Sequence, residues 1–197
     1  MELQNNRQRR KPSSELKTLI IYWSATGNTE KVANAIRRSL DQEEIEPVFK
    51  NVTEAMEEEL YEYDLVFLGS PSYQWLPPEP VQHFVKEKMK HHVKLKHIKP
   101  RAPKIPGKTA VVFCTYSGPH TGLNEAVPVC KYLGQFFEHL GFDVVGEWYI
   151  VGEFHDREDL NTMGKLGDIR GRPNEQDLAN VENQVSELIR SIRNGSG

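Results

Sequence analysis

Short apolar runs alternate with helix-type patterns through most of the chain, and this alternation constrains the fold more than any other feature. Runs rich in β-branched and aromatic residues predict five strands, at 16–23, 45–49, 65–69, 109–115 and 143–151. Apolar residues at helical spacing predict five helices, at 28–40, 53–61, 81–89, 123–140 and 175–192. Pro128 lies inside the fourth helix and predicts a kink there. Together the elements favour an α/β fold, a doubly wound parallel sheet with helices on both faces.

The length of 197 residues suits one medium domain, which we place at 16–193. Residues 1–15 are polar and basic and lack the apolar core of a secretory signal, so we expect a flexible arm, with a basic contact for a partner as the alternative. No apolar stretch is long enough for a membrane-spanning helix, and we expect no membrane insertion. Cys114 and Cys130 lack the spacing of a redox or metal motif, so we expect buried, reduced thiols in a cytoplasmic protein.

Three loops follow predicted strands, at the edge where doubly wound sheets bind their ligands. These loops are 24–29, 70–78 and 116–122. The first, SATGNT, joins a strand to a helix, so its free N–H groups and the helix dipole favour an anion. Its hydroxyls add hydrogen-bond donors, and Gly27 lets a ligand approach the backbone closely. The loop predicts a phosphate site without a cationic side chain, and the alternative is a helix capped by its own hydroxyls.

Other phosphate-binding loops are excluded by their residues. A Walker loop requires a Gly-Lys pair, and a dinucleotide site requires G-x-G-x-x-G; the sequence has neither in this loop. The loop also has no cysteine to act as the nucleophile of a phosphatase.

SATGNT after an apolar strand resembles the phosphate loop of the flavodoxin family, and the resemblance covers roughly 16–151. It implies a five-stranded sheet of order 2-1-3-4-5 and FMN as the cofactor. The FMN phosphate is then expected at Ser24, Ala25, Thr26, Gly27, Asn28 and Thr29. One side of the isoalloxazine is expected at Pro71, Ser72, Tyr73, Gln74 and Trp75. The other side is expected at Thr115, Tyr116, Ser117, Gly118 and His120.

The aromatic and histidine residues of these loops each have two interpretations. Tyr73 or Trp75 stacked on the flavin would exclude water and tune its potential, whereas the plainer alternative is packing on loop neighbours. His120 is either a proton donor or charge partner for reduced flavin, or an ordinary polar surface residue.

FMN leaves two functions open. One is an electron carrier between redox partner proteins, and the other is an NAD(P)H-dependent FMN reductase or quinone oxidoreductase. The chain has no dinucleotide fingerprint, which favours the carrier. Two features keep the reductase as the alternative. The net charge of -3 is small for a carrier. The second loop also has no glycine, which would permit the peptide flip that favours one-electron reduction.

Charge is segregated along the chain. The segment 41–64 carries ten acidic residues against Lys50, and 86–108 carries nine lysines and arginines against Glu87. We expect the basic segment at the amino ends of the strands, opposite the flavin, as a solvated loop. The alternative is a docking surface for an acidic partner or for a neighbouring subunit in a homo-oligomer. Nucleic acid is not expected, because aromatic residues do not interleave with the basic ones.

The segment 152–178 is longer than a simple connection and leaves the sheet at the flavin edge. Arg170 and Arg172 are candidates for contact with a phosphate or carboxylate substrate. Their structural alternative pairs an arginine with Asp168, while Asn174 caps the last helix.

Overall fold

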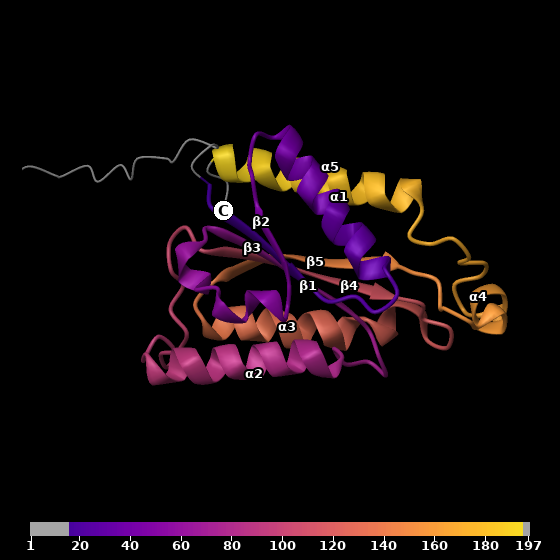
Figure 1. Ribbon diagram of the computed structural model, residues 1–197, viewed down its shortest axis with the longest axis horizontal. Helices are drawn as coiled ribbons and strands as arrows, with labels where there is room; N and C mark the ends of the chain where they lie inside the picture. Colours follow the sequence, from indigo (N-terminus) through magenta and orange to yellow (C-terminus); the bar gives the residue numbers. More distant parts are fainter. Residues whose placement is uncertain (1–15, 195–197) are drawn as a thin grey trace, which may run out of the picture.

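The computed structural model describes residues 16–194 and contains one five-stranded parallel sheet (Figure 1). The strand order is β2-β1-β3-β4-β5, as the family resemblance implies. The strands are β1 (Thr18–Tyr22), β2 (Val48–Asn51), β3 (Leu65–Pro71), β4 (Thr109–Tyr116) and β5 (Asp143–Val151). All four pairings are parallel, so the loops that follow the strands gather at one edge of the sheet.

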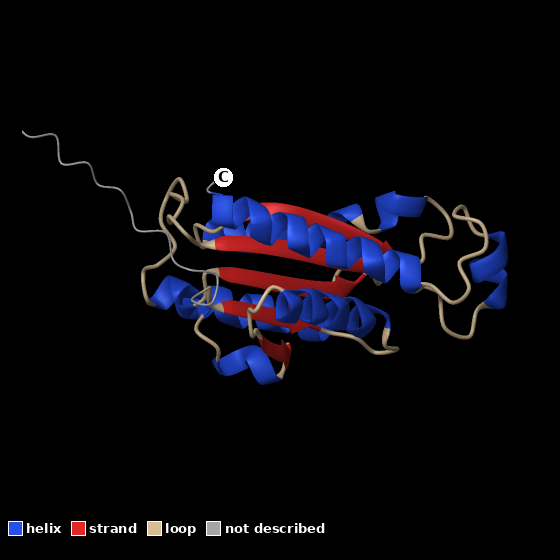
Figure 2. Cartoon of the chain, turned by 90° about the horizontal axis from the view of Figure 1, so that it is seen from above, coloured by secondary structure: helices blue, strands red, loops and turns tan. Residues whose placement is uncertain are grey.

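Helices cover both faces of the sheet, as predicted, and Figure 2 shows the strands running between the helical layers. One face carries α1 (Asn28–Gln42) and α5 (Glu175–Asn194), and the other carries α2 (Glu79–Lys94) and α3 (Val127–His139). A short helix, α4 (Glu158–Met163), lies beyond the carboxyl end of β5. None of the helices in residues 16–194 is both long enough and apolar enough to cross a membrane.

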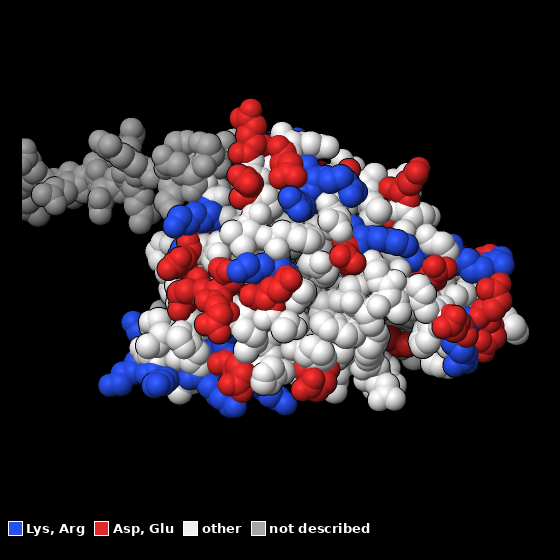
Figure 3. All heavy atoms as spheres, viewed as in Figure 1, with Lys and Arg blue, Asp and Glu red and all other residues white. Residues whose placement is uncertain are grey.

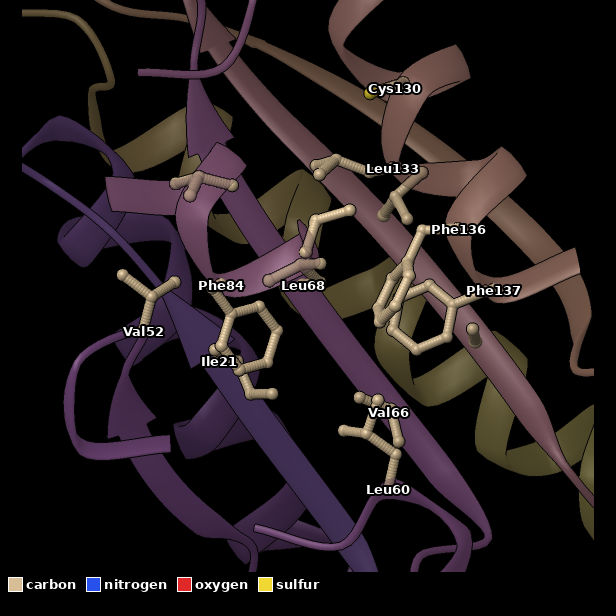
Figure 4. Close-up of a cluster of buried hydrophobic side chains, with 14 of the residues drawn as sticks. Ile21, Val52, Leu60, Val66, Leu68, Phe84, Cys130, Leu133, Phe136 and Phe137 are labelled. Atoms are coloured by element: carbon tan, nitrogen blue, oxygen red, sulfur yellow. The ribbon is translucent and has the colours of Figure 1, made fainter. Parts of the chain in front are cut away.

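Two apolar cores result, because successive strand side chains point to opposite faces. Leu19 and Ile21 belong to the core under α2 and α3, and Ile20 belongs to the core under α1 and α5. Figure 4 shows the first core, where Phe84, Phe136 and Phe137 pack over the strands. Burying an aromatic or aliphatic side chain of this size contributes about 1.5–3 kcal/mol, so the two cores provide the main stabilisation of the sheet.

The centre of the second core depends on a glycine. Gly69 in β3 faces the ring of Phe113 in β4, and a Cβ added at Gly69 would lie 2.1 Å from the ring Cζ. Real carbon atoms do not approach so closely, so the Phe113 ring occupies the volume that any larger residue at position 69 would need.

The structure differs from the predicted elements at four places. β2 begins at Val48, so Ile45, which is 2% exposed, contributes to the core from the connection before the strand. The predicted helix 53–61 is instead two 3₁₀ turns, η2 (Glu54–Glu57) and η3 (Leu60–Glu62). Helix α4 was not predicted, because its six residues are too few for a helical pattern.

The predicted kink at Pro128 is wrong. A 3₁₀ turn, η4 (Gly122–Glu125), precedes α3, and the helix itself begins at Val127. Pro128 therefore lies in the first helical turn, where its missing N–H has no intrahelical partner to lose.

Both thiols are buried and reduced, as predicted. Cys114 lies in β4 and Cys130 in α3, within the same core. Burial raises the pKa of Cys114 well above its ordinary value, so this thiol is neutral and unreactive at pH 7.

Candidate cofactor site at the carboxyl edge of the sheet

The loop between β1 and α1 leaves the start of the helix open. Gly27, the residue before the helix, has φ 94° and ψ −15°, and no side chain in residues 16–194 caps the helix N-terminus. Within the loop, the Oγ of Ser24 accepts a hydrogen bond from the Gly27 N–H at 3.0 Å. A Cβ added at Gly27 would meet nothing within 4 Å, so open space lies in front of the backbone there. The arrangement presents helix N–H groups and a positive dipole end to a ligand.

The next two residues point inward and fix the loop to the rest of the edge. The hydroxyls of Thr29 and Thr115 lie 2.7 Å apart and are buried, which joins α1 to the end of β4. The Nδ2 of Asn28 donates to the carbonyl oxygen of Glu153 at 2.9 Å, which joins the loop to the segment after β5. The Oδ1 of Asn28 is buried without a hydrogen-bond partner among the described residues. Such an atom is an acceptor available to a ligand.

The second loop is a tight two-residue turn from Tyr73 to Leu76. These two residues exchange backbone hydrogen bonds of 2.9 and 3.1 Å, and the central residues, Gln74 and Trp75, have φ 49° and 67°. Positive φ at both central positions defines a type I′ turn, a conformation that usually requires glycine or asparagine. The chain therefore holds a strained backbone here, and strain of this kind is concentrated at functional sites.

The turn presents aromatic surface to solvent. Tyr73 is 46% exposed and Trp75 is 60% exposed, whereas Pro77 and Pro78 behind them are buried. Tyr73 also packs edge-to-face on Trp23, with ring centroids 5.8 Å apart. Trp23 follows β1 directly and belongs to this edge, and sequence reasoning missed it because it was assigned to the strand.

The third loop is tied to both of its neighbours. The N–H of Ser72 donates to the carbonyl oxygen of Thr115 at 2.9 Å, and the hydroxyl of Ser117 donates to the carbonyl oxygen of Gly152 at 2.8 Å. Gly118 has φ 51°, and a Cβ there would lie 2.7 Å from the Gly122 carbonyl oxygen, so this tight turn requires glycine. The loop backbone is thus held firmly at the edge.

His120 and Tyr116 occupy different environments within this loop. His120 is exposed, and its backbone N–H donates to Oε1 of Glu125 at 2.8 Å. Tyr116 is nearly buried, and burial raises the pKa of its hydroxyl. Of the two side chains, that of His120 is the one at the surface.

The three loops contain no lysine or arginine, so hydroxyl and backbone donors define their chemistry. At the end of β1 the Tyr22 hydroxyl donates to Oε1 of Glu30 at 3.1 Å. Burial, aided by the Glu30 carboxylate, raises the pKa of Tyr22 to about 12. The charged side chains that contact these loops include the carboxylates of Glu30 and Glu125, so the attraction for an anion comes from the N–H groups and the helix dipole.

The segment after β5 forms its own network beside the third loop. Asn161 in α4 exchanges two hydrogen bonds of 2.7 Å with the backbone of Phe154, and its carbonyl oxygen accepts from Ile169. The N–H of Lys165 donates to the carbonyl oxygen of Pro119 at 2.8 Å, which attaches this segment to the third loop. Sequence reasoning missed Asn161, since a single asparagine in a polar segment carries no pattern.

Ion pairs occupy both arginines proposed for substrate contact. Arg170 Nε lies 2.9 Å from Oδ1 of Asp168, whose pKa the guanidinium lowers to about 2. Arg172 pairs with Asp177, and Oδ1 of Asn174 accepts from the Asp177 N–H at 3.1 Å. The structural alternative is thus confirmed: Asp168 pairs an arginine and Asn174 caps α5.

The second part of the basic segment, 95–108, connects the end of α2 to the start of β4 and so lies at the opposite edge of the sheet, as predicted. The first part, 86–94, belongs to α2, so the expectation of a loop is wrong there. Figure 3 shows basic side chains gathered at this end of the molecule, below the acidic side chains of the η2–η3 region. The Nζ of Lys108 lies 3.3 Å from Oδ1 of Asp64, so this ion pair joins the basic and acidic segments within one chain.

Proteins of known family resemble this chain in sequence. The sequence profile of the family described as Flavodoxin matches residues 20–183. A curated flavodoxin from Maridesulfovibrio salexigens is 38% identical over 58 residues, which are 29% of this chain and 40% of that protein. The alignment thus spans less than half of that relative's length.

Solved structures share the fold at low sequence identity. A flavodoxin from the domain Archaea has a TM-score of 0.63 and 16% identity, with 90% of this chain and 99% of that chain covered. Oxidised Flavodoxin 1 from Bacillus cereus has a TM-score of 0.62 and 17% identity, with 88% and 97% covered. Because the family profile spans most of the sheet and all three loops, the chain belongs to the flavodoxin family, whose members bind FMN.

Proposed function

We propose that this flavodoxin binds FMN at the carboxyl edge of its sheet and carries electrons between redox partner proteins, with 16–193 as the functional domain. The main support is the N-terminus of α1, which follows Gly27 and has no side-chain cap. The turn at the same edge of the sheet adds two exposed aromatic residues, Tyr73 and Trp75. Family membership supports the same cofactor and function.

The first loop fits the phosphate and ribityl parts of FMN. The open space at Gly27 admits a phosphate, which the N–H groups of the first turn and the hydroxyls of Ser24 and Thr26 bind. The unpartnered Oδ1 of Asn28 is an acceptor for a hydroxyl donor, and a ribityl chain carries hydroxyls. Thr29 contributes through its backbone N–H, and its hydroxyl is free to donate to the ligand when Thr115 is the donor of their shared hydrogen bond.

The second and third loops fit the ring. Tyr73 and Trp75 offer exposed aromatic faces, and stacking on either excludes water from the flavin. Pro71, Ser72 and Gln74 hold the turn that presents them, and the backbone of Thr115, Tyr116, Ser117 and Gly118 offers donors and acceptors to the pyrimidine edge. His120 contributes at the rim. FMN, when bound, supplies the reversible uptake of electrons.

The rim of this edge suits docking to another protein. Leu76, Leu123 and Met163 are exposed around the three loops, and Met163 is 85% exposed. A flavin edge among apolar residues lets a redox partner approach without a dedicated pocket. We propose a cytoplasmic location, in keeping with two buried free thiols. The Lys108–Asp64 ion pair lies within one chain and therefore provides no argument for a homo-oligomer.

The test is a titration of the full-length apoprotein with FMN and with riboflavin, in which quenching of the flavin fluorescence reports binding. Riboflavin lacks only the phosphate, so the proposal expects FMN to bind roughly 100-fold more tightly, about 2.7 kcal/mol. Trp75→Ala should weaken both flavins by a similar factor, roughly tenfold, because stacking does not involve the phosphate. Leu95→Ala, an exposed apolar residue at the opposite edge, is the matched control. Equal affinity for the two flavins would refute the phosphate site.

A further inference from the structure

A second cluster of chemically reactive side chains lies at the amino edge of the sheet, away from the flavin loops. Glu59 precedes η3, and His91 and His92 lie in the last turn of α2. One ligand atom from each residue lies within 4.8 Å of the other two. The Nε2 of His91 is 3.2 Å from Oε2 of Glu59, and the Nε2 of His92 is 3.8 Å from Oε1.

His92 makes this cluster more than a surface ion pair. Its side chain is 0% exposed, and Nε2 is buried without a hydrogen-bond partner among residues 16–194. The other ring nitrogen, Nδ1, lies 3.1 Å from Nδ1 of His97. When Nδ1 of His92 carries the ring hydrogen and donates it to His97, Nε2 of His92 keeps its lone pair and faces the Glu59 carboxylate. A buried lone pair beside a carboxylate is the arrangement that a cation completes.

The surroundings keep both histidines in place. The ring of Tyr61 packs edge-to-face on His92 and on His97, with centroid distances of 5.0 and 4.9 Å. Burial lowers the pKa of His92 to about 4, so its ring is neutral at pH 7. Lys88 of the same helix donates its ammonium hydrogens to the carbonyl oxygens of Met56 and Glu58. It is therefore engaged with the backbone of the acidic turn.

Two imidazoles and a carboxylate form a ligand set typical of zinc. Ligands about 2.0–2.1 Å from a tetrahedral zinc lie about 3.3 Å from one another. The 3.2 Å contact of His91 with Glu59 already matches this spacing, and the 3.8 Å contact of His92 is close to it. The ligand atoms of the two histidines lie within 4.8 Å of each other, and zinc would draw them together by side-chain rotation. His91 is half exposed, so water can reach a remaining coordination position.

We propose that Glu59, His91 and His92 bind one divalent transition-metal ion, with zinc as the best match to the ligand set. His97 acts as a positioning residue that fixes the His92 tautomer, in the way that outer hydrogen bonds orient metal-bound imidazoles. The ion would add a link between η3 and the end of α2, which already contact each other through Tyr61 and His92. The site is independent of FMN.

The experiment is calorimetric titration of the full-length, untagged, FMN-loaded protein with zinc chloride. We expect one zinc ion per chain, and we expect His91→Ala and Glu59→Gln each to weaken binding by roughly tenfold or more. Both residues are partly exposed, so these variants should fold. His83→Ala removes an exposed histidine of the same helix and should leave the affinity unchanged.

Thermal unfolding gives a second measurement. Zinc should raise the Tm of the unmodified protein and of His83→Ala, because it binds the folded chain, and should not raise the Tm of Glu59→Gln. Absence of zinc binding by the unmodified protein would overturn the proposal. Binding that persists with equal affinity in both His91→Ala and Glu59→Gln would overturn it as well, since the ion would then lie elsewhere.

Discussion

Replacement of Gly27 by alanine separates the cost of its backbone conformation from the loss of ligand space. At φ 94° an alanine is strained, and a left-handed residue costs about 1–2 kcal/mol. The new Cβ meets no protein atom within 4 Å, so no steric term is added in the apoprotein. For a domain of this size the loss corresponds to a fall in Tm of about 2–8 °C.

The effect on ligands should be larger and selective. The methyl group enters the space assigned to the phosphate, so Gly27→Ala should weaken FMN roughly tenfold or more, at least about 1.4 kcal/mol. Riboflavin has no phosphate and should bind Gly27→Ala as it binds the unmodified protein. Fluorescence titration of the apoprotein with each flavin measures both values.

Gly107 provides a matched control. It has φ 78°, a Cβ there also meets nothing within 4 Å, and it precedes β4 at the opposite edge. Gly107→Ala should therefore lower the Tm by a similar amount and leave both flavin affinities unchanged. The reasoning fails if Gly27→Ala binds FMN normally, or if it weakens riboflavin as much as FMN.

Three further predictions follow from buried contacts and from the tyrosines. Thr29→Val removes the partner of the Thr115 hydroxyl at 2.7 Å and should lower the free energy of unfolding, measured in urea, by about 1–3 kcal/mol. The double variant Thr29→Val with Thr115→Val has no unpaired hydroxyl and should recover most of this loss. Gly69→Ala forces a Cβ against the Phe113 ring and should cost about 1–3 kcal/mol, partly relieved by adding Phe113→Leu; an unchanged urea midpoint would contradict the packing. All seven tyrosines have a pKa raised chiefly by burial, so tyrosinate absorbance of the native protein should rise only above pH 10, while the urea-unfolded chain titrates near 10. Because the unfolded chain loses these protons first, stability should fall as pH rises through 10, and a native titration centred at 10 would refute the burial.

The sequence predicted β1, β3 and β4 well because these inner strands are buried and therefore read as continuous apolar runs. It failed where tertiary packing decides the local structure. Ile45 has the apolar character of a strand residue but is buried in the connection before β2, and 53–61 forms two 3₁₀ turns in place of one helix. Pro128 was misplaced because the start of α3 carries no side-chain cap to mark it.

The candidate site, too, was predictable from the sequence only in part. The first loop was predictable from SATGNT because hydroxyls and glycine at a strand-to-helix junction have few other uses. The positive φ angles of Gln74 and Trp75 were not predictable, since neither residue favours that conformation. The cluster of Glu59 with His91 was invisible as well, because the two residues are far apart in sequence and meet only in the fold.

The measurement that tests the proposed function most directly is anaerobic reduction of the FMN-loaded protein, monitored by its visible absorption. One cuvette receives dithionite, and the others receive NADH or NADPH. An electron carrier between proteins should bleach with dithionite and remain oxidised with either nicotinamide, because its sequence contains no dinucleotide fingerprint. Rapid bleaching by NADH or NADPH would contradict the account and identify the protein as a reductase.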